Sequence, residues 1–405
     1  MITIQDQDPA DFDPRLGKRL GGYIVAARVA DGAMGRVYEG RHPDTKARVA
    51  IKVLHDEVAR DRVAVERFKR EYETAKELDN PYIVKVLEFG DTADRSHFMT
   101  MEYLEGEELS KAIAHKKPLP FARIVRLVSQ VALGLEHAHS YGFIHRDLKP
   151  DNIFLCSTPE GAQVRLLDFG SVKLQVETGA KLTALGTTLG SPYYMSPEQA
   201  TGAADVDQRS DVFALGAIVY EMLTGKTAFD APTVAMILMK ILNQSPPPPS
   251  TINPASTHAI DSVVEHALRK DKEERYATAR ELADGLIAAF GVSGSCDAWA
   301  QKPEAEVAAA LAGAKAPEQA RARVAAAAAT PPAPSEAAAP THVQAVSTNA
   351  RREASVSAPA PTSARAAARE SDVSLQVPMQ SNKTKLVLVV AVAVVLLALI
   401  LLISR

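Results

Sequence analysis

The chain has 405 residues, with 46 Lys and Arg against 49 Asp and Glu, and a formal net charge of −3. Residues 1–291 carry 35 basic and 41 acidic side chains, whereas residues 292–405 carry 11 and 8. A mildly acidic body lacks the concentrated basic face of a nucleic-acid-binding protein, so no nucleic acid is expected as a partner. The two cysteines, Cys156 and Cys296, are too few and too far apart for a disulfide scaffold or a Cys-based zinc site.

The body of the chain is predicted to contain strands first and helices afterwards. Residues 1–16 are polar and acidic, and form a short tail without the apolar core of a secretory signal. Short β-branched runs predict strands at 23–29, 36–40, 48–53, 83–89 and 97–102, with a helix at 58–78. Apolar residues at helical spacing then predict helices at 124–139, 210–223, 234–242, 259–268 and 279–290. This order predicts an α+β fold of two sub-domains, 17–102 and 105–291.

Residues 292–385 are rich in Ala, Pro, Ser and Thr. Segments with so few large side chains do not bury enough apolar area to offset the entropy of ordering. We therefore predict a disordered linker. The alternative is a solitary helix at 304–329, which the alanines favour, but it lacks a wide apolar stripe with which to dock.

Residues 386–403 are eighteen uncharged apolar residues. A helix of this length spans about 27 Å, close to the roughly 30 Å of a bilayer core. The alternative of a buried core helix is disfavoured, because such a helix normally keeps a polar stripe. The segment is predicted to be a single membrane-spanning helix, with the lipid bilayer as its partner. Lys383 and Lys385 precede it, so the positive-inside rule places the body on the cytoplasmic side of the cell (inner) membrane.

Five motifs follow one another along residues 1–291. They are a glycine-rich loop at 29–37 (VADGAMGRV), VAIK at 49–52, HRDLKPDN at 145–152, DFG at 168–170 and SPE at 196–198. Together they resemble the signature of protein kinases, and specifically of the eukaryotic-type Ser/Thr protein kinases of bacteria. The resemblance covers roughly residues 20–290 and implies a two-lobed kinase domain at 17–291, with ATP and Mg²⁺ as cofactors and Mn²⁺ as an alternative ion. It also implies proteins with Ser or Thr hydroxyls as substrates.

The resemblance assigns an ATP site to the strand-rich lobe. Glycines let the backbone of a loop approach phosphates, but Ala30 occupies the place of the usual first glycine, which we expect to reduce loop flexibility and not nucleotide binding. Lys52 is implied to hold the α/β-phosphates and Glu71 to orient it. Met101 is implied as the gatekeeper, and Leu155 as the floor below adenine. The full set is Val29, Ala30, Asp31, Gly32, Ala33, Met34, Gly35, Arg36, Val37, Ala50, Lys52, Glu71, Met101, Glu102, Leu104 and Leu155.

The HRDLKPDN and DFG motifs carry the residues implied for chemistry. Asp147 is implied as the catalytic base for the substrate hydroxyl, and Lys149 as the charge beside the γ-phosphate that favours Ser/Thr specificity. Asn152 and Asp168 offer the hard oxygen ligands that Mg²⁺ prefers. His145 is implied to be structural.

Residues 171–197 are implied to form the activation loop. We expect autophosphorylation there, with the phosphate paired to Arg146. The candidate sites are Thr183, Thr187 and Thr188, whereas Ser191 occupies a place that usually contacts the catalytic Asp. Two structural contacts are implied as well: Glu198 with Arg275, and Asp211 with the catalytic loop.

Three functional hypotheses remain: a membrane-tethered Ser/Thr kinase that acts in signalling, a pseudokinase that only binds nucleotide or partners, and a tail that recruits partners. Because Lys52, Asp147, Asn152 and Asp168 are all present, we favour the active kinase. The tail is equally explained as a spacer. Tethering would concentrate the kinase at the membrane and favour kinase–kinase self-association.

Overall fold

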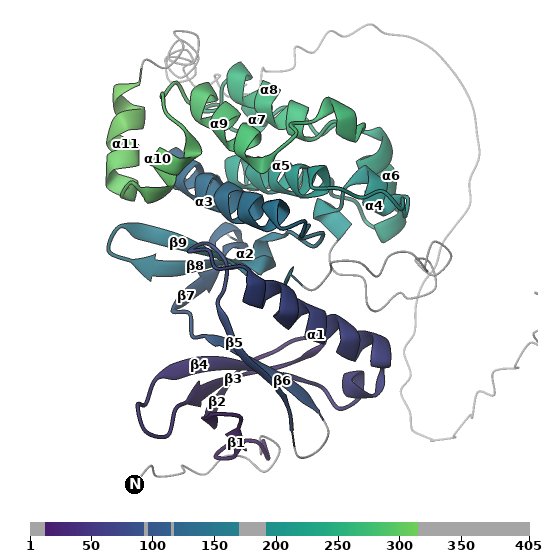
Figure 1. Cartoon of the computed structure of the whole chain (residues 1–405). Helices are drawn as coiled ribbons and strands as arrows, with labels where there is room; N and C mark the ends of the chain where they lie inside the picture. Colours follow the sequence, from purple (N-terminus) through teal and green to yellow (C-terminus); the bar gives the residue numbers. More distant parts are fainter. Residues whose placement is uncertain (1–12, 93–95, 115–116, 170–191, 315–405) are drawn as a thin grey trace, which may run out of the picture. The chain divides into compact units, whose positions relative to one another are not determined.

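The computed structural model describes residues 13–92, 96–114, 117–169 and 192–314, which all belong to one compact unit, Met1–Ala333 (Figure 1). The predicted order of strands followed by helices is present. A strand-rich N-lobe precedes a helical C-lobe. The region where Lys52 of the N-lobe meets Asp168, which follows the sheet of the C-lobe, is called the cleft.

The N-lobe is an antiparallel sheet of six strands in the order β1-β2-β3-β4-β6-β5. The predicted strand at 83–89 begins later, at Val86, because Ile83 instead forms a parallel bridge with Leu166 of the C-lobe. The strands are β1 (Arg19–Leu20), β2 (Tyr23–Asp31), β3 (Gly35–Arg41), β4 (Arg48–Leu54), β5 (Val86–Asp91) and β6 (His97–Glu102).

Strand β4 shows why Lys52 faces the cleft. Side chains alternate between the two faces of a strand, and Val49, Ile51 and Val53 are buried in one cluster with Val25, Tyr38 and Phe98. Ala50 and Lys52 therefore share the opposite face. Their cross-strand neighbours lie on that face too, namely Val37 and Met99 beside Lys52, and Met101 beside Ala50.

Helix α1 (Arg62–Glu77) covers the sheet and carries Glu71. The helix predicted at 58–78 is divided, because Asp61 is extended and its carboxylate caps the helix by accepting a hydrogen bond from the Val63 N–H. A short 3₁₀ helix, η2 (Val58–Arg60), precedes it.

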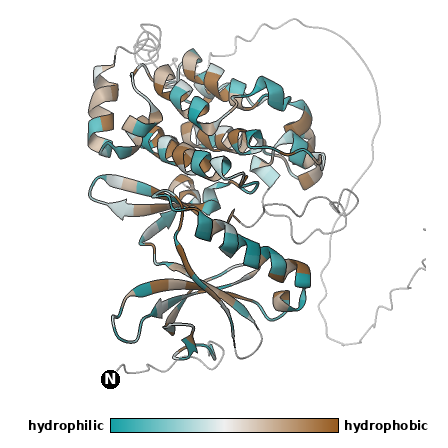
Figure 2. Cartoon of the chain, viewed as in Figure 1, coloured by the Kyte–Doolittle hydropathy of each residue, from teal (hydrophilic) through white to brown (hydrophobic). Residues whose placement is uncertain are grey.

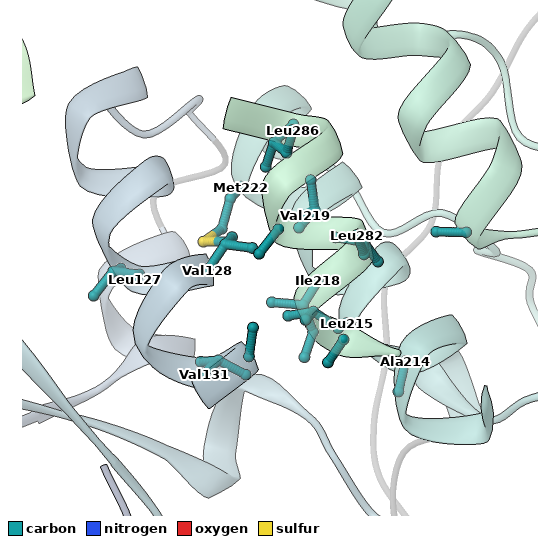
Figure 3. Close-up of a cluster of buried hydrophobic side chains, with 14 of the residues drawn as sticks. Leu127, Val128, Val131, Ala214, Leu215, Ile218, Val219, Met222, Leu282 and Leu286 are labelled. Atoms are coloured by element: carbon teal, nitrogen blue, oxygen red, sulfur yellow. The ribbon is translucent and has the colours of Figure 1, made fainter. Parts of the chain in front are cut away.

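The C-lobe helices surround one large apolar core. Helices α3 (Phe121–Ser140), α5 (Arg209–Thr224) and α9 (Ala279–Ala289) face one another there through Val128, Ile218 and Leu282 (Figure 3). Brown apolar faces of these helices point inward in Figure 2. The elements are α2 (Leu109–Ile113), α3 (Phe121–Ser140), η3 (Pro150–Asn152), η6 (Pro192–Tyr194), α4 (Pro197–Ala200), α5 (Arg209–Thr224), α6 (Val234–Asn243), α7 (Pro249–Ile252), α8 (His258–Ala267), η7 (Lys272–Glu274) and α9 (Ala279–Ala289).

A second, three-stranded sheet lies at the lobe junction. Its order is β7-β8-β9, with β7 (Gly106–Glu108), β8 (Ile153–Thr158) and β9 (Gly161–Leu166). The backbone of β9 joins the lobes, because Leu166 N–H donates to Tyr82 O at 2.7 Å and Leu166 O accepts from Val84 N–H at 3.0 Å.

The predicted boundary of the linker at residue 292 is wrong. Two further helices, α10 (Cys296–Gln301) and α11 (Glu304–Gly313), lie beside α3 (Figure 1). The apolar side chains Cys296, Trp299 and Val307 anchor them in the C-lobe core. These few side chains are enough to hold the two helices on the C-lobe, because each of them is at most 5% exposed. The rest of the predicted linker, 315–385, lies outside the described residues.

The predicted membrane span, 386–403, also lies outside the described residues. Within the part of the chain that the structure describes, no helix combines the length and the apolar composition of a membrane-spanning segment.

Candidate active site

Lys52 stands between two carboxylates in the cleft. Its Nζ donates to Glu71 Oε1 at 2.7 Å and to Asp168 Oδ1 at 2.8 Å. Glu71 comes from α1 and Asp168 follows β9, so this one cation connects the N-lobe sheet, its helix and the C-lobe. The predicted contact of Lys52 with Glu71 is therefore present.

The charges of this cluster are strongly coupled. Burial alone would lower the pKa of Lys52, but the carboxylates of Asp168 and Glu71 outweigh it and raise the pKa above its usual value. Burial, together with the nearby Asp168 charge, raises the pKa of Glu71 to about 8. For Asp168, burial opposes ionisation, but Lys52 holds the pKa below its usual range. The Lys52 ammonium thus lies between two carboxyl groups, of which Asp168 ionises more readily than Glu71.

The glycine-rich loop is the hairpin between β2 and β3. Gly32 N–H donates to Gly35 O at 3.0 Å, and the ring Nε2 of His55 lies 2.8 Å from Gly32 O. A Cβ on Gly35 would lie 2.2 Å from Val53 O of β4, so only glycine lets the hairpin approach that strand so closely. Ala30 lies within β2, opposite Val37, which is compatible with an ordinary side chain.

The loop is also held by polar side-chain contacts that the motif did not reveal. Arg36 Nε donates to Asp31 Oδ2 at 2.8 Å, across the turn end of the hairpin. His55 Nε2 lies 3.1 Å from Asp31 Oδ1. These contacts fix the loop in the absence of the first glycine.

The predicted adenine floor, Leu155, is wrong. Leu155 is 2% exposed and belongs to the C-lobe core. Alternation along β8 places Phe154 on the other face, opposite Arg165 of β9. Arg165 Nε donates to Glu102 Oε1 at 3.1 Å, so this face is the one toward Glu102 of the predicted ATP site, and half-buried Phe154 is the residue available there. The motif alone does not determine which of Phe154 and Leu155 faces the ATP site.

Asp147 is held in the catalytic loop by its motif neighbours. Lys149 Nζ donates to Asp147 Oδ2 at 2.8 Å, and Asn152 Nδ2 donates to Asp147 O at 2.7 Å. The Asp147 side chain remains 42% exposed, so a substrate hydroxyl can reach it. The structure thus brings the three polar residues of this motif together at the mouth of the cleft.

Asp211, at the start of α5, anchors the catalytic loop as predicted. It is 1% exposed, and its carboxylate accepts hydrogen bonds from His145 N–H at 2.8 Å and Arg146 N–H at 2.9 Å. Burial opposes ionisation, but His139 and His145 keep the pKa of Asp211 below its usual value. The loop needs this anchor because Arg146 adopts a φ of 62°, a region that side chains other than glycine rarely occupy.

The DFG segment is fixed by a second contact of the same loop. The ring Nε2 of His145 lies 2.9 Å from Leu167 O, and its ring centroid is 4.7 Å from that of Phe169. The backbone of Asp168 has a φ of 56°. His145 therefore has the structural role that the sequence implied.

The side-chain oxygens of Asn152 and Asp168 are suitable ligands for a divalent cation. Because the amide nitrogen of Asn152 donates to Asp147 O, the amide oxygen is directed away from that bond and can act as a ligand. Lys52 keeps the Asp168 carboxylate ionised. Hard oxygen donors of this kind suit Mg²⁺ and Mn²⁺. The described residues contain no cluster of three or more His, Cys, Asp or Glu side chains that would hold a metal by itself.

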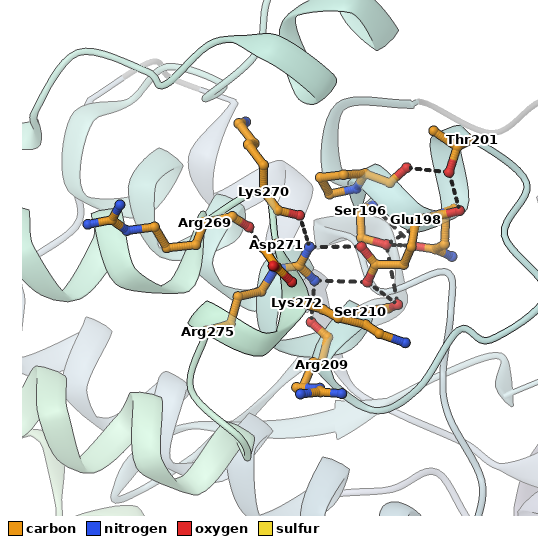
Figure 4. Close-up of polar contacts among 12 residues, drawn as sticks. Ser196, Glu198, Thr201, Arg209, Ser210, Arg269, Lys270, Asp271, Lys272 and Arg275 are labelled. Atoms are coloured by element: carbon orange, nitrogen blue, oxygen red, sulfur yellow. Dashed lines mark hydrogen bonds and ion pairs between the residues drawn. The ribbon is translucent and has the colours of Figure 1, made fainter.

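The predicted Glu198–Arg275 pair is a bidentate ion pair (Figure 4). Both N···O distances are 2.8 Å, and the Arg275 side chain is 0% exposed. Its remaining donors bind the backbone oxygens of Arg209, Arg269 and Lys270. The pair joins the end of the activation segment to the C-lobe.

Gln199 is a structural residue of the site that the sequence analysis missed. Its Nε2 donates to Arg146 O at 2.7 Å, which holds the strained peptide beside Asp147. Gln199 also closes a capping box with Ser196 at the start of α4. The signal was present in the sequence, because Ser-Pro-Glu-Gln has the Ser-x-x-Gln spacing of such a box. The activation-loop residues Thr183, Thr187, Thr188 and Ser191 lie outside the described residues.

Comparison with known proteins gives one family. The protein kinase domain model matches residues 23–285. The serine/threonine-protein kinase pkn3 of Myxococcus xanthus is 38% identical over 284 residues, which cover 69% of this chain and 52% of that protein. PrkC of Bacillus subtilis is 32% identical over 276 residues, 68% of this chain and 42% of that protein. The chain thus spans about half or less of the length of these curated relatives.

Solved structures agree with this result. A crystal structure of the Mycobacterium tuberculosis PknI kinase domain is 30% identical with a TM-score of 0.54, covering 68% of this chain and 98% of that one. A second structure of the same kinase domain is 30% identical with a TM-score of 0.53. The expected two-lobed fold is confirmed. The chain belongs to the protein kinase family, and the relatives that it resembles are serine/threonine kinases of bacteria.

Proposed function

We propose that the chain is an active serine/threonine protein kinase, which transfers the γ-phosphoryl group of ATP to Ser or Thr hydroxyls of proteins. The observation that carries this proposal is the complete polar set of the cleft. Lys52 is paired with Glu71 and Asp168, and Asp147 is paired with Lys149. A pseudokinase that only binds nucleotide would not need to retain all of these groups in working positions.

Phosphoryl transfer requires positioning and charge stabilisation more than covalent chemistry. Asp147 orients the substrate hydroxyl and accepts its proton. Lys149 lies beside it and supplies positive charge for the moving phosphoryl group, and Lys52 holds the α- and β-phosphates. Asn152 and Asp168 would hold Mg²⁺, with Mn²⁺ as an alternative, and the bound ion neutralises phosphate charge.

The test is the transfer of labelled γ-phosphate from ATP to casein by the full chain. Asp147→Asn keeps the size of the side chain but removes the base, and we expect the rate to fall by about 10²-fold or more. Asp151→Asn is the matched control, because Asp151 is an exposed carboxylate in the same motif. Equal rates for wild type and Asp147→Asn would contradict the role of Asp147.

We propose that autophosphorylation of the activation loop at Thr183, Thr187 or Thr188 activates the enzyme. Support comes from Arg146, whose Nε is buried and has no hydrogen-bond partner among the described residues. A phosphate is the charged acceptor that such a guanidinium binds. Mass spectrometry of the active wild type tests this, with Asp147→Asn as the unmodified reference. Fully active protein without phosphate at these sites would refute it.

We propose that residues 386–403 tether the kinase to the cytoplasmic face of the cell membrane. The apolar run and the preceding Lys383 and Lys385 support this. Removing 382–405 should move the kinase from the membrane fraction to the soluble fraction and, by diluting it, reduce loop phosphorylation between copies. Soluble protein with the same phosphorylation would contradict the link to self-association.

A further inference from the structure

The helices α10 and α11 follow the matched kinase domain, and they contact β9, the strand that leads to Asp168. The contact is made by two buried polar side chains of α3, which lie between the helices and the strand. Gln130 is 1% exposed and Arg126 is 5% exposed. Buried polar groups of this kind are retained only where their hydrogen bonds are satisfied.

Gln130 joins α10 to β9 through the nitrogen and the oxygen of its side-chain amide. Its Nε2 donates to Ala300 O of α10 at 2.8 Å, and its Oε1 accepts from Val164 N–H of β9 at 2.8 Å. Strand β9 pairs with β8 along one edge, and its other edge is bridged to Ile83 only at Leu166. Gln130 satisfies the backbone N–H of Val164, which has no strand partner there. Without it, both backbone groups would be buried and unpaired.

Arg126 repeats this connection one helical turn earlier. Its Nε donates to Lys302 O at 2.9 Å, and another of its nitrogens donates to Ala162 O of β9. In addition, Glu304 N–H of α11 donates to Glu160 O in the turn between β8 and β9 at 2.9 Å. Residues 300–304 are therefore joined to β9 and its turn at several successive points.

Strand β9 in turn holds two parts of the cleft. Arg165 donates to the side chain of Glu102, at the end of β6, and to Pro81 O. Leu166 is hydrogen-bonded to the N-lobe backbone, and Asp168 follows two residues later. The position of one short strand therefore sets both the Glu102 side chain and the Asp168 carboxylate that binds Lys52.

We propose that Gln130 and Arg126 are positioning residues for nucleotide binding. They fix β9 between α3 and residues 300–302, so that β9 holds Glu102 and Asp168 in place. The functional kinase unit accordingly extends to about residue 313, beyond the matched range 23–285. The inference rests on the proposed kinase activity and adds a role for α10 and α11 in it.

The test compares two variants of the full chain. Gln130→Leu removes both hydrogen bonds to the strand and to α10 with little change in volume. Arg280→Met is the matched control, because Arg280 ties α10 to α3 through Asp297 and Glu136 but does not contact β9. Both variants should lower the thermal unfolding temperature. Only Gln130→Leu should weaken binding of a fluorescent ADP analogue with Mg²⁺ and raise the KM for ATP, by about 5-fold, the factor for one net hydrogen bond. The KM for casein should not change.

A milder variant covers the case in which Gln130→Leu does not fold. Arg126→Lys keeps the charge, but a single ammonium does not reproduce the planar fork that reaches two carbonyls. It should raise the KM for ATP in the same direction. Folded variants with unchanged KM for ATP, or an equal rise in Arg280→Met, would overturn the inference. A wild type that neither binds the ADP analogue nor transfers phosphate would instead overturn the proposed function, and the inference with it.

Discussion

Among the described residues, the ion pair of Lys52 in the cleft and the ion pair of Arg275 in the C-lobe differ in how their surroundings hold them. In the cleft, Lys52 divides one ammonium between Glu71 and an Asp168 that is 47% exposed. In the C-lobe, Arg275 is fully buried and engages Glu198 with two parallel bonds. A point charge with interchangeable partners suits a site that must admit a ligand, whereas a planar fork fixes geometry.

The helices around the two pairs differ in the same way. Helix α1, which carries Glu71, buries only Phe68, Glu71, Thr74 and Ala75. Helix α5, beside the Arg275 pair, buries fourteen of its sixteen residues. The cleft pair thus supports a helix with few other anchors, and the C-lobe pair completes an already packed core. We expect loss of the cleft pair to lower activity and loss of the C-lobe pair to lower the free energy of unfolding.

The largest effect should follow from Arg275→Leu. The change leaves Glu198 as a buried charge without its partner, which costs about 3–5 kcal/mol. Denaturant unfolding measures this loss. Arg269→Leu is the control, because Arg269 is half-exposed in an i,i+4 pair with Glu265 and should change stability by less than about 0.5 kcal/mol. Equal losses in the two variants would remove the distinction between the C-lobe pair and a surface pair.

Lys52→Met should reduce phosphate transfer by about 10²-fold, equivalent to about 2.7 kcal/mol in the barrier. It should cost less stability than Arg275→Leu, because burial raises the pKa of Glu71, so this carboxyl group can be neutral when the ammonium is absent. Transfer assays and denaturant unfolding of the same preparation separate the effects, with the exposed Lys85→Met as control. A Lys52→Met protein that transfers phosphate normally but unfolds more easily than wild type would contradict the assignment of the cleft pair to activity.

Gly35→Ala should displace the glycine-rich hairpin from β4 and cost about 1–3 kcal/mol, because the added Cβ meets Val53 O at 2.2 Å. We also expect weaker nucleotide binding. Gly32→Ala is the matched variant, since its Cβ would lie 3.4 Å from the nearest atom, Gly35 O. Calorimetry of nucleotide binding and thermal unfolding should show a large difference between these two substitutions; similar values would mean that the close approach to β4 is unimportant.

The smallest expected effect on stability is that of replacing Lys270. Its Nζ is buried and, unlike the Arg275 guanidinium, has no carboxylate partner among the described residues. Burial, followed by the charge of Arg275, lowers the pKa of Lys270 to about 8 from 10.5, although its Nζ lies 4.4 Å from the Phe229 ring centre. Because the folded state holds this proton less tightly than the unfolded state, wild-type stability should rise between about pH 8 and 10.5. Lys270→Met should be more stable at pH 7 by about 1 kcal/mol, after allowance for solvent screening and the cation–π contact.

This advantage of Lys270→Met over wild type should shrink as the pH rises through that window. Unfolding of both proteins in urea at pH 7, 9 and 10.5 measures it, and the difference between them removes the contribution of other titrating groups. An advantage that is constant with pH would show that the Lys270 ammonium is not destabilised by burial.

The sequence by itself determined the groups that bear the chemistry and the order of the lobes. Lys52, Asp147, Asn152 and Asp168 lie in short motifs whose residue types and spacing follow from the phosphates and ions that they serve. The alternation of β4 and the helical period of α3 likewise depend on local spacing, and both elements were placed correctly. Asp211 and the Glu198–Arg275 pair were found through the family resemblance, and the structure contains these contacts.

Only the tertiary structure decided the features that depend on packing partners far away in the chain. Leu155 and Phe154 are adjacent apolar residues, and packing against the C-lobe core determines which one faces the cleft. Residues 296–313 resemble a linker in composition, yet a few apolar side chains and the buried amide of Gln130 hold them on α3. Such contacts leave no periodic signal, because Gln130 and Arg126 lie 170 and 176 residues before their partners Ala300 and Lys302.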